Sequence, residues 1–161
     1  AEEMQRRMAQ TANPAAPTIS DFERLPVESY DDMTHYVHDA MKDFWGGPKF
    51  TDSPLMQLQI VSDAMQAENG NATKALRRVL SDAIERLKPD GQRSFTAAEW
   101  MLYNILELKI LQSQKVRDVA RKLVMSESDL YRKQKAAYTE IARIVADMER
   151  DARNRGADGH A

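Results

Sequence analysis

The sequence predicts an all-α fold of about six helices, with a C-terminal helix-turn-helix whose second helix continues into a long C-terminal helix. From residue 30 onward, apolar residues recur at intervals of three and four, which is the period of a helix with one buried face. No segment alternates apolar and polar residues over the length of a strand. The stretch from Ser126 to about Arg153 contains neither glycine nor proline, so nothing in it would break a helix.

Length and composition are those of one ordinary domain. A chain of 161 residues and 18.3 kDa can bury a core without cross-links. Cysteine is absent, which excludes disulfides and thiolate metal sites. No apolar run is long enough to cross a membrane, and the first residues lack the apolar segment of a secretion signal. We therefore expect a soluble, cytoplasmic protein.

Residues 1–28 are expected to form a flexible N-terminal arm or linker. They show no sustained apolar period, and Pro14, Pro17 and Pro26 would break any helix that ran through them. Because the sequence begins with Ala1 rather than methionine, the chain could be a piece of a larger parent protein.

Three helices are expected in a helical N-terminal subdomain over residues 29–94. The first covers residues 30–44, where apolar residues fall at helical spacing. The second begins after Ser53, a capping residue followed by proline at the first helical position. The third runs from Asn71, which can cap it, to about Leu87, and it has the most regular apolar stripe in the chain.

Residues 95–153 are expected to form the helix-turn-helix region, followed by a disordered tail over residues 154–161. Thr96 and Glu99 have the spacing of a capping box, in which two side chains satisfy backbone amides at a helix start. The helix after them, which should end near Leu111, is apolar over so much of its circumference that we expect it to be central. One side of the last helix carries apolar residues at nearly heptad spacing: Leu130, Ala137, Ile141, Ile144 and Met148.

Two short amphipathic helices meet at a tight joint between Lys115 and Lys135. The second begins at Ser126, which has the spacing of a capping box with Asp129. A helix-turn-helix needs a small residue where its helices cross, an apolar residue in the turn, and a second helix with one face free. The residues suited to the crossing, the turn and the seating of the second helix are Ala120, Met125 and Leu130.

The charge of this segment indicates a polyanionic partner. Residues 1–70 hold 5 basic and 12 acidic residues, whereas residues 71–161 hold 18 and 13. Residues 115–135 alone hold seven basic and three acidic residues. With Leu130 turned inward, the outer face of the second helix would enter the major groove of double-stranded DNA, and the first helix would contact phosphates. The expected DNA-binding residues are Gln114, Lys115, Arg121, Lys122, Ser126, Glu127, Ser128, Tyr131, Arg132 and Lys135.

Three features of residues 100–142 are arranged as in a known family. A helix opens on an aromatic residue, Trp100, the run Asp118-Val119-Ala120-Arg121-Lys122-Leu123 follows, and Ser126 then starts a helix that contains Leu130-Tyr131-Arg132. In these features the chain resembles the sigma-factor region 4-like and LuxR-type helix-turn-helix domains of bacterial transcription regulators. The resemblance covers residues 95–150 well and residues 52–94 loosely. It implies a DNA-binding transcription regulator whose recognition helix begins at Ser126.

The sequence departs from that family's pattern at two positions. Val124 stands where most members have glycine between the helices, and a left-handed turn there would cost a β-branched residue energy. Lys133 stands where many members have an aliphatic residue that seats the recognition helix.

The alternative function is a helical protein-interaction or oligomerisation module that has kept this fold without binding DNA. The apolar stripe on the last helix could pair with a second copy to form a homodimer, or with a partner such as the transcription machinery. The acidic first half of the chain could dock a basic protein. The stripe could equally pack on the helix that begins at Trp100, within the same chain.

Signatures of catalysis and of metal binding are weak. His35 and His38, with Asp31, Asp32 and Asp39 nearby, could supply ligands from one helix, but zinc sites usually draw on at least three well-placed ligands and no second cluster is visible. The chain has no nucleophile elbow and no phosphate-binding loop. We expect no enzymatic activity, no cofactor and no metal site.

Overall fold

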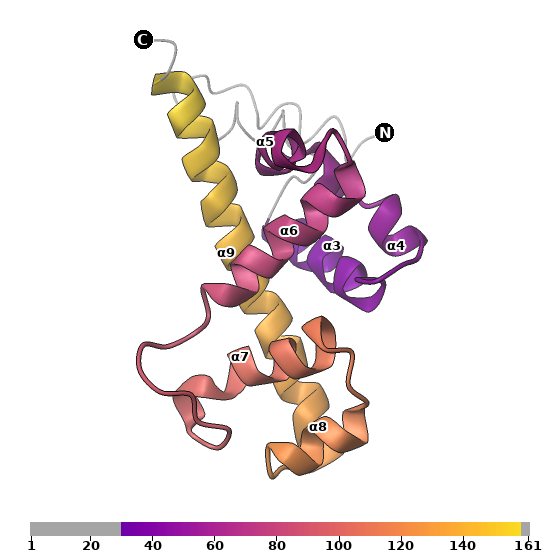
Figure 1. Cartoon of the computed structure of the whole chain (residues 1–161), viewed down its shortest axis with the longest axis vertical. Helices are drawn as coiled ribbons and strands as arrows, with labels where there is room; N and C mark the ends of the chain where they lie inside the picture. The colour runs from indigo at the N-terminus through magenta and orange to yellow at the C-terminus, as the bar shows by residue number, and fades with distance from the viewer. Residues whose placement is uncertain (1–29, 159–161) are drawn as a thin grey trace, which may run out of the picture.

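The computed structural model describes residues 30–158, and every regular element in that range is a helix (Figure 1). The all-α prediction is confirmed for these residues, whereas the arm predicted over residues 1–28 lies outside them. The range contains seven α-helices, compared with the six or so expected. They are α3 (Tyr30–Lys42), α4 (Pro48–Thr51), α5 (Gln59–Met65), α6 (Ala72–Glu85), α7 (Met101–Leu106), α8 (Val116–Lys122) and α9 (Glu127–Asp158).

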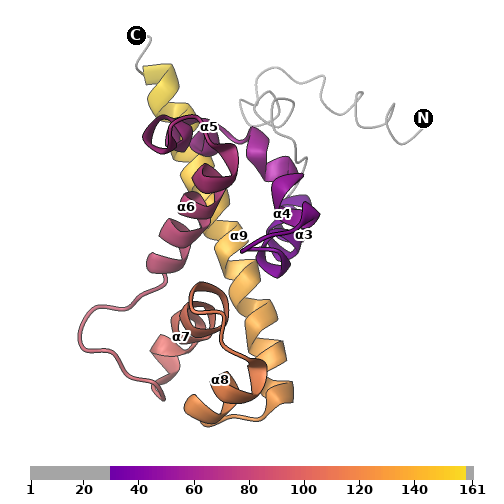
Figure 2. The same ribbon diagram turned by 45° about the vertical axis from the view of Figure 1, so that its right-hand side comes forward.

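Helix α9 is the axis on which α3, α5, α6, α7 and α8 pack. It has 32 residues, which corresponds to roughly 48 Å. Helices α5 and α6 lie along its C-terminal part, α3 beside its middle, and α7 and α8 along its N-terminal part (Figures 1 and 2). It extends beyond residue 153, so the tail predicted over 154–161 is helical as far as Asp158, and residues 159–161 lie outside the described range. Ala152 is the last buried residue of this helix among those that the structure describes.

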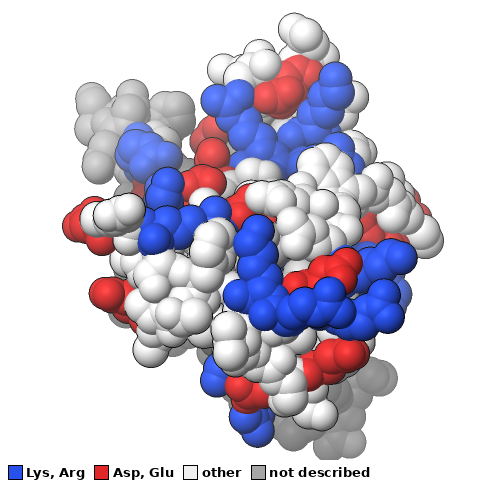
Figure 3. Space-filling view, turned by 60° about the horizontal axis from the view of Figure 1, so that its bottom comes forward, with Lys and Arg blue, Asp and Glu red and all other residues white. Residues whose placement is uncertain are grey.

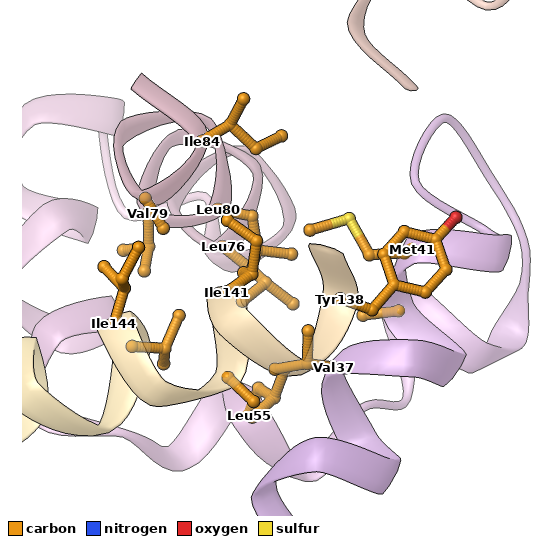
Figure 4. Close-up of a cluster of buried hydrophobic side chains, with 14 of the residues drawn as sticks. Val37, Met41, Leu55, Leu76, Val79, Leu80, Ile84, Tyr138, Ile141 and Ile144 are labelled. Atoms are coloured by element: carbon orange, nitrogen blue, oxygen red, sulfur yellow. The ribbon is translucent and has the colours of Figure 1, made fainter. Parts of the chain in front are cut away.

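A large hydrophobic cluster fills the space between α9 and helices α3, α5, α6 and α7. Figure 4 shows part of it, with side chains of α3, α6 and α9 directed toward one another. The cluster combines residues from both sides of the boundary predicted at residue 94, so 29–94 and 95–153 share this core. Its fully buried large side chains include Phe50, Leu55, Leu58, Leu76, Leu80, Ile84, Leu106 and Ile141.

The apolar stripe of α9 belongs to the chain's own core. Four of its five residues are buried, and Met148 is partly buried and packed against the large cluster. These side chains are therefore covered by helices of the same chain. A stripe that is already buried has no apolar area left to bury against a second copy. A homodimer through the C-terminal helix stays a prediction, and it would have to use another surface of α9.

A smaller hydrophobic cluster holds α7, α8 and the start of α9 together. Phe95, Met101, Val116 and Met125 pack at its edge, partly buried. Because this cluster includes residues of both α8 and α9, the two helices are held in a defined relation to each other. Its buried members are Ile105, Leu108, Val119, Ala120, Leu123 and Leu130.

The second predicted helix is interrupted. Ser53 caps a 3₁₀ turn over Pro54–Gln57, with its hydroxyl accepting from the amide of Leu55 at 3.1 Å. Leu58 is extended, with φ −67° and ψ 148°, and α5 begins only after it. The prediction for the third helix is confirmed, since the side chain of Asn71 accepts from the amide of Lys74 at 2.9 Å.

A residue from the far end of the chain caps α5. The buried carboxylate of Glu149 on α9 accepts from the amide of Gln59 and from that of Ile60, both at 3.0 Å. Arg153 donates to the same carboxylate at 2.7 Å. A carboxylate at a helix N-terminus pairs with unsatisfied amides and with the positive end of the helix dipole. Glu149 thereby joins α9 to α5.

The helix that begins near Trp100 starts differently from the prediction. The residue before its first 3₁₀ turn is Ala97, which makes no side-chain cap. Ser94 serves instead, its hydroxyl accepting from the amides of Thr96 at 3.3 Å and Ala97 at 3.0 Å. The capping box of Thr96 and Glu99 is therefore wrong. The helix closes with a π-helical turn over Glu107–Leu111, the predicted end.

Candidate nucleic-acid interface

The connection between α8 and α9 is a tight left-handed turn. Val124 has φ +57° and a side chain that is 77% exposed. Its amide donates to the carbonyl of Arg121 at 3.2 Å. The amide of Met125 donates to the carbonyl of Ala120 at 3.0 Å. This pair of bonds is a Schellman motif, in which the left-handed residue is usually glycine. The turn keeps that geometry with valine, at the energetic cost expected for a β-branched residue.

The start of α9 is capped as predicted. The hydroxyl of Ser126 accepts from the amide of Asp129 at 3.0 Å. The carboxylate of Asp129 forms ion pairs with Arg132 and, at 3.3 Å, with Lys133. The hydrogen bond from Lys133, together with the positive charges of Lys133 and Arg132, lowers the pKa of the Asp129 carboxyl. Lys133 thus turns toward Asp129.

The predicted outer face of α9 is exposed. Leu130 is completely buried, whereas the side chain of Arg132 is 78% exposed and Tyr131 is 55% exposed. Tyr131 is one of the few large hydrophobic side chains left on the surface of the described residues. The other exposed members of this face are Glu127, Ser128 and Lys135, with Ser126 at its start.

Cations of α8 and its flanks lie on the same end of the molecule. Lys115, Arg121 and Lys122 are exposed, as is Arg117, and the Lys122 ammonium lies 4.9 Å from the centre of the Phe95 ring. Figure 3, which looks onto this end, shows lysine and arginine side chains in a band with a few acidic groups among them. Within residues 30–158, the cations that take part in no ion pair include Lys115, Arg117, Arg121, Lys122 and Lys135.

Gln114 is the least exposed of the predicted DNA-binding residues. It is half-buried, and its side-chain amide donates to the side-chain oxygen Oε1 of Gln112 at 2.8 Å. Its backbone amide donates to the carbonyl of Leu108 at 3.0 Å. These bonds fix the chain just before α8, where Lys115 is the N-cap residue.

The two histidines of α3 have partners within the protein. His35 lies 3.4 Å from the carboxylate of Asp39, and the ring of His38 packs edge-on against Tyr138 at 5.1 Å. Burial lowers the pKa of His38, and the charges of Lys135 and Lys42 lower it further. Among residues 30–158 no group of three histidine or acidic side chains is arranged to hold a metal ion.

Comparisons with known proteins do not place the chain in a family. No family model, no curated protein and no solved structure matches it. Among the described helices, none combines the length and the apolar character needed to cross a membrane.

Two features of this end of the molecule were missed in the sequence. Arg117 is exposed and lies one helical turn before Arg121, so the i, i+4 spacing of two arginines could have added it to the expected contacts. Asp129 holds both Arg132 and Lys133 in the unbound protein. Its spacing of three and four residues from them could have indicated these pairs.

Proposed function

We propose that the chain is a DNA-binding transcription regulator in which α8 and α9 act as a helix-turn-helix. The first turns of α9 would lie in the major groove, with Tyr131, Arg132 and Lys135 facing base edges or nearby phosphates. Lys115, Arg121 and Lys122 would contact the phosphate backbone. The likeness of residues 95–150 to sigma-factor region 4-like and LuxR-type domains supports the same function.

One observation carries the proposal. The outer face of α9 is exposed next to four unpaired cations at α8, while Leu130 on the opposite side is completely buried. Unpaired cations at a protein surface give up no internal ion pair when they meet a phosphate. An exposed face on a helix that is seated by a buried leucine can enter a groove without any rearrangement of the core.

The first experiment measures duplex affinity against salt. Fluorescence anisotropy with labelled double-stranded DNA should give a dissociation constant that rises steeply with salt, because phosphate contacts release counterions. The slope of log affinity against log salt should be reduced by about 0.9 for each of Lys115, Arg121 and Lys122 that is changed to alanine. A chain with no salt-sensitive affinity for any duplex would contradict the proposal.

The second experiment tests base reading and has a matched control. A preferred site is selected from random duplexes, and Arg132→Ala is compared with Arg150→Ala. Both arginines are exposed on α9 and pair with an aspartate three residues earlier, Asp129 or Asp147. If Arg132 contacts a base, its removal should cost about 1–3 kcal/mol of binding free energy and relax the preference at one position. Arg150→Ala should leave the binding free energy and the base preference unchanged.

A further inference from the structure

A second cationic surface lies beside the α8 flank. An open pocket of about 340 Å³ is formed where the turn after α3 meets the end of the π-helical turn. Lys42, Asp43 and Trp45 line it from one side, and Lys109, Ile110 and Ser113 from the other.

Trp45 is exposed and yet fixed in position. Its indole N–H donates to the carbonyl of Ile110 at 2.6 Å, and the guanidinium carbon of Arg77 lies 5.1 Å from the centre of the ring. Arg77 is itself anchored by donating to the carbonyl of Phe44 at 3.0 Å. The indole nevertheless keeps 56% of its surface exposed. A large aromatic ring held on two sides and open on the rest is a preformed contact surface.

The charges around this ring favour an anion. Lys42 and Lys109 form no ion pair with any part of the chain that the structure describes. The acid of the pocket, Asp43, accepts a hydrogen bond from the backbone amide of Lys49 at 2.9 Å. Lysines near helix ends also complement the helix dipole. That role would account for the two cations but not for the exposed, anchored indole between them.

The surface is continuous with the proposed DNA interface. Ser113 lines the pocket and is followed directly by Gln114 and Lys115. On the other side, the ring of His38 packs against that of Tyr138 at 5.1 Å, and Lys42 and Lys135 each lie one helical turn from one of these two residues. The pocket therefore adjoins both the start of α8 and the exposed face of α9.

We propose that Lys42, Trp45, Lys109 and Ser113 form a second contact for duplex DNA, which grips the sugar-phosphate backbone outside the base pairs that α9 would read. The lysines meet phosphates and the indole packs on a deoxyribose. This inference rests on the proposed function and lengthens the footprint beyond that of α8 and α9. Because this surface binds the sugar-phosphate backbone of the duplex, the contact adds affinity without sequence preference.

The test uses the full chain and two readouts. Removing two phosphate contacts in Lys42→Ala/Lys109→Ala should weaken duplex binding roughly tenfold or more at 0.1 M salt and reduce the salt slope by about 1.8. Arg150→Ala/Arg155→Ala removes two charges near the far end of α9 and should change neither quantity. The chain has two tryptophans, so Trp100→Phe leaves Trp45 as the only indole. Its emission should shift or be quenched as the duplex binds.

The outcomes separate this inference from the proposed function. If the unaltered chain shows no salt-sensitive affinity for a duplex, the proposed function and the second contact are both refuted. If it binds and the lysine double variant retains the affinity and slope of the unaltered chain, DNA binding stands and the second contact is overturned. Should Trp100→Phe fail to fold, the affinity and slope of the lysine variant decide alone.

Discussion

The capping of α5 by Glu149 leads to a large predicted effect on stability. Changing Glu149 to alanine removes two amide-to-carboxylate hydrogen bonds and the ion pair with Arg153, whose side chain is 17% exposed. Hydrogen bonds to charged groups contribute about 1.5–3 kcal/mol each, and breaking a buried ion pair costs about 3–5 kcal/mol. Because these terms describe overlapping interactions, we expect a loss of about 3–5 kcal/mol in the free energy of unfolding.

The assay is urea unfolding followed by circular dichroism at a helix wavelength. Glu149→Gln keeps one acceptor oxygen, so it should lose less than the alanine variant, roughly 2 kcal/mol. Glu140→Ala is the matched control on the same helix, because Glu140 pairs with Arg143 at the surface and its loss should cost less than about 1 kcal/mol. Equal stabilities for Glu149→Ala and Glu140→Ala would refute the reasoning.

Three further predictions concern the turn between α8 and α9, the exposed face of α9 and the dependence of stability on pH. Val124→Gly relieves a left-handed valine that costs about 1–2 kcal/mol, against about 0.5–1 kcal/mol for the extra freedom of glycine when unfolded, so thermal unfolding should show a stability gain of up to about 1.5 kcal/mol. A lower stability would contradict the strain argument. Asp129→Asn frees Arg132 and Lys133, so anisotropy should show severalfold tighter duplex binding; unchanged affinity would mean that these cations do not meet DNA. Burial raises the pKa of Tyr138 to about 12, whereas an unfolded tyrosine ionises near 10. The unfolded state therefore releases its proton first, and the folded state should lose up to about 2–3 kcal/mol as the pH rises from about 10 to 12. Tyr138→Phe should show a shallower loss of melting temperature over that range, and an equal loss would count against the burial effect.

Much of the helical architecture could be predicted because local chemistry decides it. The stripe of α6 and the caps at Asn71 and Ser126 depend on residues within one or two turns, and the structure confirms them. The interior position of Leu130 followed in the same way from helical spacing. These features are encoded in neighbouring residues, which a single sequence displays directly.

What could not be predicted depends on contacts between distant residues. The break at Leu58 accompanies a cap supplied by Glu149, 90 positions after Gln59, and no local pattern connects them. The four residues of α4 are too few to show a helical period. The stripe of α9 has the spacing of a dimer seam, and only the fold shows that helices of the same chain cover it.

Because α9 is one unbroken helix, the packing of the core is linked to the position of the helix's exposed face. One unbroken helix contributes Ile141 to the large core and carries Tyr131 and Arg132 on its exposed face. A core substitution that rotated this helix by about 20° would displace a side-chain atom that lies about 5 Å from the helix axis. The displacement of roughly 2 Å exceeds the tolerance of a hydrogen bond. Under the proposed function, repacking the core around Ile141 would therefore change which base pairs are preferred, and selection for stability would also act on specificity.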